Sequence, residues 1–202
     1  GKTTYQPRVC PLVDNENAFI PILTNNLNSI SGWPDLVTPA YVSESGMYKE
    51  VYSQVDGMTK NYESFDIDAT FRNVRGDPII MMFYIWCHYM SLVFEGKLVP
   101  YFDYMAENTI DYNTRIYRLV TDSTHMYVTK IAATGYAFPI SVNLSSFFDY
   151  NHETPFNDQN KEITVRFRCG GAEYLDDVLI YEFNETVCIF NSSMTEKNRE
   201  KI

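Results

Sequence analysis

The sequence lacks the short motifs by which most enzyme sites are recognised. It contains no GxSxG, no P-loop, no HExxH and no GxGxxG. Histidine is scarce, and a Ser/His/Asp site needs one histidine beside a nucleophile. We expect His88 to be a hydrogen-bonded core residue, and His125 and His152 to lie solvated in turns. We therefore expect no enzyme activity, no cofactor and no metal ion.

Cysteine is also scarce, and the four cysteines lie far apart in the sequence. None belongs to a CxxC pair, and their spacing fits no zinc template. One of them lies inside an apolar run, which favours a buried free thiol. We expect no signal peptide and a reducing cytosol. The thiols expected to be reduced are those of Cys10, Cys87, Cys169 and Cys188.

Positive charge is in deficit. The 16 Lys and Arg residues stand against 26 Asp and Glu residues, which gives a formal net charge of −10. The sequence has no run of Lys and Arg that could follow a phosphate backbone, and an acidic chain repels DNA at long range. This argues against nucleic-acid binding driven by phosphate contacts, although DNA could pass near such a surface without adhering to it.

Proline is concentrated at the start of the chain. Five of the nine prolines fall within residues 1–40, where they disfavour long helices and central strands. We interpret this segment as an extended arm with an irregular turn around Trp33. The expected organisation has three parts: this arm, a β domain with one helix over residues 41–190, and a charged tail over residues 191–202.

Only one long apolar run occurs, and it is preceded by Asp77 and Pro78 and followed by Gly96. These residues are typical of an N-cap, a first helical position and a left-handed residue after a helix. We predict a helix over about residues 78–95, buried on most sides, with Trp86 in the core. At 1.5 Å per residue the apolar run is about 24 Å long, short of the roughly 30 Å bilayer core, so no membrane span is expected.

Strands are indicated by alternation of apolar and polar residues. The clearest case has Phe65, Ile67, Ala69 and Phe71 on one face, with Asp66, Asp68 and Thr70 on the other. The segment from Gly135 to Pro139 should break the sheet, and Gly170-Gly171 should end or kink the strand before it. The predicted strands cover residues 62–71, 112–120, 126–133, 162–169, 179–183 and 187–190.

Strands do not alternate regularly with helices in this order, so a parallel doubly wound sheet is not expected. The predicted fold class is mainly β, with an added helix. We predict an antiparallel β-sandwich or barrel that packs on one buried helix.

Two chemical interpretations stay open. Asp66 and Asp68 share a strand face and could act as acid and base in a small hydrolase, although an exposed face explains them more simply. Aromatic residues make up 15% of the chain and could form a carbohydrate platform. Against this, most aromatics fall at core-spaced positions and the two tryptophans are far apart in the sequence.

The order of these elements resembles the tail tube proteins of contractile-tailed bacteriophages and their baseplate tube relatives. In that family a strand leads into a helix with a Trp, then a hairpin, a Gly–aromatic–Pro stretch and a final strand pair. The best-matching stretches are Ile131 to Pro139, Phe147 to Tyr150 and Ile163 to Phe167. The resemblance covers about residues 62–183.

The resemblance implies hexameric rings stacked into a hollow tube, with a β-barrel lining the lumen, helices outside and no enzymatic activity. It implies a virion protein assembled in the host bacterial cytoplasm, with neighbouring tail proteins, the sheath among them, as partners. DNA would pass through the lumen without specific binding. The long N-terminal segment and the extra residues from Asn184 onward leave a baseplate, tip or neck position open. A carbohydrate- or receptor-binding β-sandwich module of a tail or fibre is the alternative.

Residues expected to matter for structure and assembly are Trp33, Asp77, Pro78, Trp86, Gly96, Gly135, Phe138 and Pro139.

Overall fold

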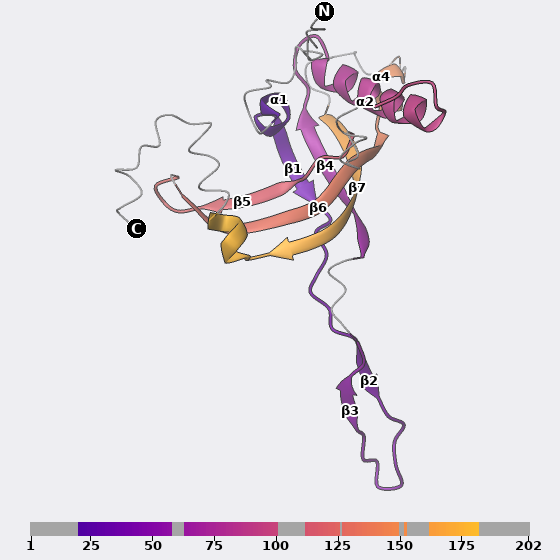
Figure 1. Ribbon diagram of the computed structural model, residues 1–202, viewed down its shortest axis with the longest axis vertical. Helices are drawn as coiled ribbons and strands as arrows, with labels where there is room; N and C mark the ends of the chain where they lie inside the picture. Colours follow the sequence, from indigo (N-terminus) through magenta and orange to yellow (C-terminus); the bar gives the residue numbers. More distant parts are fainter. Residues whose placement is uncertain are drawn as a thin grey trace, which may run out of the picture.

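The computed structural model describes residues 20–57, 63–100, 112–125, 127–149, 152 and 162–181. They form a curled five-stranded antiparallel sheet in the order β1-β4-β7-β6-β5, a separate two-stranded hairpin, β2-β3, and one long helix, α2 (Figure 1). The mainly β fold with a single long helix is therefore confirmed. The strands are β1 (Leu27–Ser31), β2 (Ala40–Val42), β3 (Ser53–Val55), β4 (Ser64–Arg72), β5 (Tyr117–Thr121), β6 (Val128–Val142) and β7 (Glu162–Tyr174). The helices are α1 (Pro21–Thr24), α2 (Pro78–Phe94) and α4 (Ser145–Phe148).

The centre of the sheet is the pair β4 and β7. They pair antiparallel in one uninterrupted register, from Ser64 opposite Gly170 to Arg72 opposite Glu162. Alternate residues of both strands face the core, as the sequence pattern predicts for β4 and for the first half of β7. The buried residues of these two strands are Ile67, Ala69, Phe71, Ile163, Val165, Phe167, Cys169, Gly170 and Ala172.

Helix α2 has the predicted ends, and Asp77 is its N-cap residue, but the Asp77 side chain does not cap the helix. Asp77 has φ 54° and makes no capping hydrogen bond with its side chain. Instead its Oδ1 accepts a hydrogen bond from Asn73 Nδ2 at 2.8 Å, so the carboxylate holds the preceding turn. At the other end Gly96 has φ 72°, and its N–H donates to the Val93 carbonyl at 3.1 Å, which closes the helix as expected.

Burial of α2 on most sides is wrong, because one side of the helix packs on the sheet and the other is exposed. Ile79, Met82 and Phe83 are its buried residues. His88 lies on the exposed side and stacks on the Tyr84 ring at 5.9 Å, so it is not a core residue. The remaining exposed apolar side chains of the helix are Met81, Ile85 and Phe94.

Trp86 joins α2 to the sheet and to the segment before β5. Its ring stacks on Phe83 at 6.1 Å and meets Phe167 edge-on at 6.5 Å. Its indole Nε1 donates a hydrogen bond to the Tyr112 carbonyl at 3.0 Å. Trp86 is partly buried and packs against the core cluster, in keeping with its predicted position.

The predicted break at Gly135 to Pro139 is wrong, because β6 continues through this segment to Val142. A Cβ on Gly135 would lie 3.0 Å from the Gly170 carbonyl oxygen, so the glycine permits close approach of β6 and β7 where the sheet bends. Gly171 has φ 66°, yet β7 continues beyond it to Tyr174. The two glycines bend paired strands and do not end them.

Pro139 is fully buried inside β6, a position that would normally lose a ladder hydrogen bond. On the β5 side of β6 the last bonded residue is Ala137, which bridges to Thr114, so within the described residues no strand pairs with this edge at the proline. The register with β7 also shifts between Pro139 and Ser141, which marks a bulge. Proline is tolerated here because no neighbouring strand requires its missing N–H.

Other boundaries also differ from the prediction. β5 begins at Tyr117, and of the preceding residues only Thr114 bridges to Ala137. Residues 177–181 are helical where a strand was predicted at 179–183. Within the predicted arm, residues 27–31 form β1, an edge strand paired with β4. The strand predicted at 187–190, the tail at 191–202 and the first 19 residues lie outside the described residues.

In the described part of the chain, no helix is both long and apolar enough to cross a membrane.

Candidate assembly surfaces

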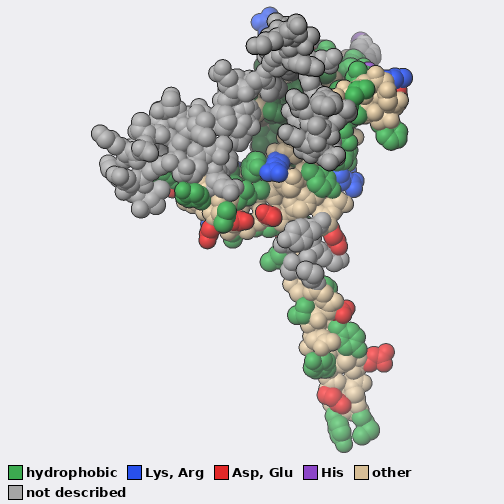
Figure 2. All heavy atoms as spheres, in the orientation of Figure 1, with side chains coloured by type: hydrophobic (Ala, Val, Ile, Leu, Met, Phe, Trp, Pro, Cys, Tyr) green, Lys and Arg blue, Asp and Glu red, His purple; other side chains and the backbone are tan. Residues whose placement is uncertain are grey.

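The hairpin formed by β2 and β3 projects away from the five-stranded sheet (Figure 1). Its ladder runs from Ala40 opposite Val55 to Val42 opposite Ser53, and all six strand residues are exposed. Figure 2 shows hydrophobic side chains along the hairpin as far as its tip. Seven large apolar side chains are exposed on it: Tyr41, Val42, Met47, Tyr48, Val51, Tyr52 and Val55. A two-stranded hairpin with both faces exposed is at best marginally stable in water, so this surface is suited to contact with another surface.

Trp33 lies at the root of this hairpin, where it packs against two strands of the sheet. The indole packs on Phe65 of β4 at 6.3 Å and on Tyr174 of β7 at 6.1 Å. Tyr174 also donates a hydrogen bond from its hydroxyl to the Pro34 carbonyl at 2.6 Å. The chain therefore leaves the sheet along a path fixed by three aromatic rings and one hydrogen bond.

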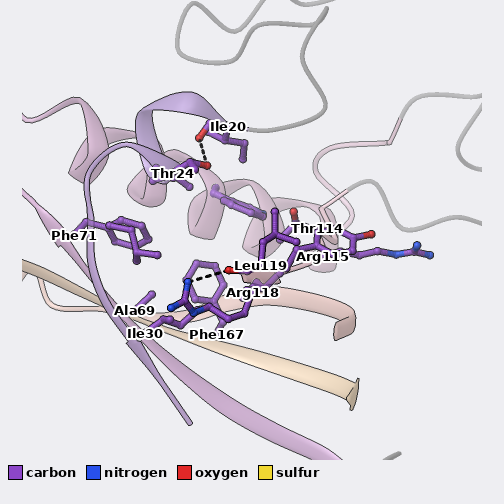
Figure 3. A pocket seen from close by; sticks show the side chains of 15 residues that line it. Ile20, Thr24, Ile30, Ala69, Phe71, Thr114, Arg115, Arg118, Leu119 and Phe167 are labelled. Carbon is purple, nitrogen blue, oxygen red and sulfur yellow. Dashed lines mark hydrogen bonds between the residues drawn. The ribbon is translucent and has the colours of Figure 1, made fainter. Parts of the chain in front are cut away.

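A cavity of about 600 Å³ lies between the two edge strands of the sheet, β1 and β5 (Figure 3). Its apolar lining includes Ile30 from β1 and Leu119 from β5, with Phe71 and Phe167 from the strands between them. Arg118 lies along the lining and donates to the Leu119 carbonyl at 3.3 Å. The sheet therefore curls until its edges face a common space, but the two edges do not pair, so the barrel is left half open.

Opposite charges face each other across β4 and β7 on the side of the sheet away from α2. Arg166 holds Asp68 through two contacts, Nε to Oδ1 at 2.7 Å and Nη2 to Oδ2 at 3.2 Å. Arg168 forms an ion pair with Asp66, Nε to Oδ1 at 2.6 Å, and donates a hydrogen bond from Nη2 to Oδ2 at 3.4 Å. The hydrogen bond from Arg166, assisted by its charge, lowers the pKa of Asp68. Both carboxylates are thus engaged by arginines, which favours a structural ladder over the acid–base hypothesis.

Aromatic rings continue this outer face onto β6. Phe138 stacks with Tyr136 at 6.3 Å and meets Tyr112 edge-on at 6.2 Å. Phe138 is also the register partner of Arg168, so the rings lie beside the charged ladder.

The eight residues singled out in the sequence do not converge on one site. Trp33 lies at the hairpin root, while Gly135, Phe138 and Pro139 belong to β6. The others lie within α2 or beside its ends: Asp77, Pro78, Trp86 and Gly96. In the described residues, no group of three or more His, Cys, Asp and Glu side chains could hold a metal ion.

Two features escaped the sequence analysis. The exposure of the hairpin is not visible in a pattern that lacks clean alternation. The arginines of the ladder left a signal, since Arg166 and Arg168 repeat at the same two-residue spacing as Asp66 and Asp68. The spacing indicates ion pairs only if β4 pairs with β7, and the sequence alone does not show this pairing.

The described residues therefore define a mainly β protein, with a curled antiparallel sheet packed on one long helix and a projecting hairpin that exposes apolar side chains. Over residues 3–201 the sequence matches the family described as "Putative phage tail tube protein". The chain belongs to this family, and the resemblance stated from the order of elements is confirmed.

Among solved structures, the chain is similar to three parts of contractile injection systems. A chain of the "anti-feeding prophage cap (AFP tube terminating cap)" matches with TM-score 0.44 and 11% identity, over 73% of this chain and 78% of that one. A chain of the "PVC sheath/tube terminator in extended state" matches with TM-score 0.41 and 12% identity, over 74% and 85%. A chain of the "PVC sheath-tube complex in extended state" matches with TM-score 0.42 and 11% identity, over 73% and 79%. No curated protein matches the chain.

Proposed function

We propose that this chain is a non-enzymatic structural subunit of a phage tail, of the tube or baseplate-tube type. It assembles into hexameric rings that stack around a DNA-conducting channel, and its partners are copies of itself, neighbouring tail proteins and the sheath. Its place is the virion, after assembly in the host bacterial cytoplasm. The observation that carries the proposal is the projecting hairpin, whose large apolar side chains are 46–86% exposed in the described part of the chain.

The hairpin supplies the contact between stacked rings. Burying three of its large side chains would contribute about 5–9 kcal/mol, since each contributes about 1.5–3 kcal/mol. Association costs about 4–15 kcal/mol in lost freedom of motion, so one hairpin contact roughly offsets the cost of one docking event. When two rings dock, several hairpin contacts form at once, but the cost in lost freedom of motion is met only once. Stacking is therefore favourable for rings and not for single subunits.

The free edges β1 and β5 supply the lateral contacts within a ring. Each presents unpaired backbone groups on one side within the described residues, and such edges pair readily with strands of another chain. The apolar cavity between them gives an incoming neighbour a surface to cover. Pairing at these edges would extend the sheet from subunit to subunit around a ring.

Light scattering and electron microscopy of the purified chain test the proposal. We expect six-fold rings and stacks of rings for the wild type. Met47→Ser with Tyr48→Ser at the hairpin tip should yield rings that do not stack. Val178→Ser with Tyr181→Ser is the matched control, because these exposed apolar residues follow β7 and lie outside the hairpin. A folded wild-type chain that stays monomeric at every concentration would refute the proposed function.

One observation favours the alternative of a carbohydrate- or receptor-binding module. Tyr136 is 40% exposed and stacks with Phe138 on the outer face, an arrangement that a sugar ring could cover. Binding of a glycan by a monomer, lost in Tyr136→Ala, would support that function in place of the tube.

A further inference from the structure

On its two central strands, β4 and β7, the face of the sheet away from α2 carries arginines that are each opposed by an acidic residue. On β4 and β7 these arginines are Arg72, Arg166 and Arg168, and their register partners are Glu162, Asp68 and Asp66. No described helix packs on this face, whereas α2 covers the other one. If the chain forms a ring around a channel, as proposed above, the uncovered face is the one able to line it.

The contacts of two of these pairs use the donors that a phosphate group would need. Arg166 donates from Nε and Nη2 to the two oxygens of Asp68. Arg168 forms an ion pair with Asp66, with Nε 2.6 Å from Oδ1, and donates one hydrogen bond, from Nη2 to Oδ2. Arginine also binds phosphate in a bidentate way, through two N–H donors of its guanidinium group. Because a carboxylate already lies against these N–H groups, neither arginine offers a free pair of donors to a passing DNA strand.

Folding stability does not account for these pairs. Their side chains are 35–53% exposed, and exposed ion pairs contribute only about 0–1 kcal/mol. Apolar or uncharged polar residues would serve an exposed strand face equally well, as Thr70 and Thr164 do one step along the same ladder.

We propose that Asp66 and Asp68 keep the channel wall from binding DNA by occupying Arg168 and Arg166. This inference rests on the proposed function, because it requires the outer face to line the channel. In a ring the effect is multiplied, since every subunit contributes both pairs to the same wall.

The decisive variant is Asp66→Asn with Asp68→Asn in the full chain, assembled into particles. A short fluorescent DNA duplex is added, and the duplex that sediments with the particles is measured. The wild type should retain none above background. The variant should bind on the order of tenfold more tightly or better, and raising salt from about 50 to about 200 mM should release the duplex, as expected for phosphate contacts.

Two controls separate the ion pairs from net charge. Asp149→Asn with Asp177→Asn makes the same charge change at exposed acids outside the ladder, and it should leave retention at the wild-type level. Adding Arg166→Gln and Arg168→Gln to the decisive variant should abolish retention. Equal retention in the Asp149/Asp177 control would overturn the proposal in favour of a general charge effect.

Electron microscopy of each sample distinguishes the two possible failures. Rings that form normally, but retain no DNA when both aspartates are replaced, overturn the role of the ladder and leave the tube function standing. Absence of rings in the wild type overturns both. If the double variant does not fold, Asp68→Asn alone exposes Arg166 and is judged by the same retention assay.

Discussion

Replacing Trp86 by Ala removes the side chain that ties α2 to the sheet. The substitution deletes the stack on Phe83, the edge contact with Phe167 and the hydrogen bond to the Tyr112 carbonyl. Replacing a large core aromatic by Ala costs about 3–5 kcal/mol. Because Trp86 is only partly buried, we expect the lower end, about 3 kcal/mol, and the lost hydrogen bond accounts for about 1 kcal/mol of it.

The assay is reversible denaturant unfolding of the unassembled chain, supported by the thermal midpoint. For a domain of this size, 3 kcal/mol corresponds to a fall in midpoint of roughly 6–12 °C. Trp86→Phe keeps most ring contacts but not the donor, and should lose about 1 kcal/mol. Tyr84→Ala lies on the exposed side of the same helix and is the matched control, with a change within about 0.5 kcal/mol. Equal losses for Trp86→Ala and Tyr84→Ala would refute this packing of α2.

Three further predictions concern acid, thiols and truncation. The arginine-bound Asp68 has a lowered pKa, so its contribution to stability is complete above its ordinary pKa of 3.8 and lost as pH falls through the lowered value. Urea unfolding should therefore show the difference in free energy of unfolding between wild type and Asp68→Asn narrowing as pH falls below 3.8, and a constant difference would contradict the pairing. Burial, helped by the Asp66 charge, raises the pKa of the Cys169 thiol to about 12. Mass spectrometry should find it reduced, and alkylated about 10³-fold more slowly than in the urea-unfolded chain, because the thiolate is the reacting form. Replacing residues 43–52 with a two-residue Asn-Gly turn should leave the circular dichroism spectrum unchanged and abolish stacking. Deleting residues 20–31 should instead destabilise the fold, because it removes β1. The reverse pattern would contradict both assignments.

The sequence predicts those elements whose local pattern agrees with their environment. β4 has one buried and one polar face, so strict alternation from Phe65 to Phe71 revealed both the strand and its orientation. The ends of α2 were also predictable, because Pro78 and Gly96 have backbone preferences that act locally.

The errors arise where tertiary contacts override a local preference. Gly135 and Pro139 are typical of a break, but pairing with β7 carries β6 through both positions. The exposed side of α2 carries apolar residues as freely as its buried side, so the sequence could not show which faces remain uncovered.

The pairing of β4 with β7 also sets the order in which the chain can fold. Asp66 and Arg168 are separated by 102 positions, and the strands that hold them form the centre of the sheet. During synthesis β4 and α2 emerge long before β7, and contacts of such long range form slowly. β4 therefore cannot form its central pairing until β7, a strand made much later, has been synthesised. A chain truncated before β7 cannot form this sheet. The complete five-stranded sheet therefore exists only after β7 has been synthesised.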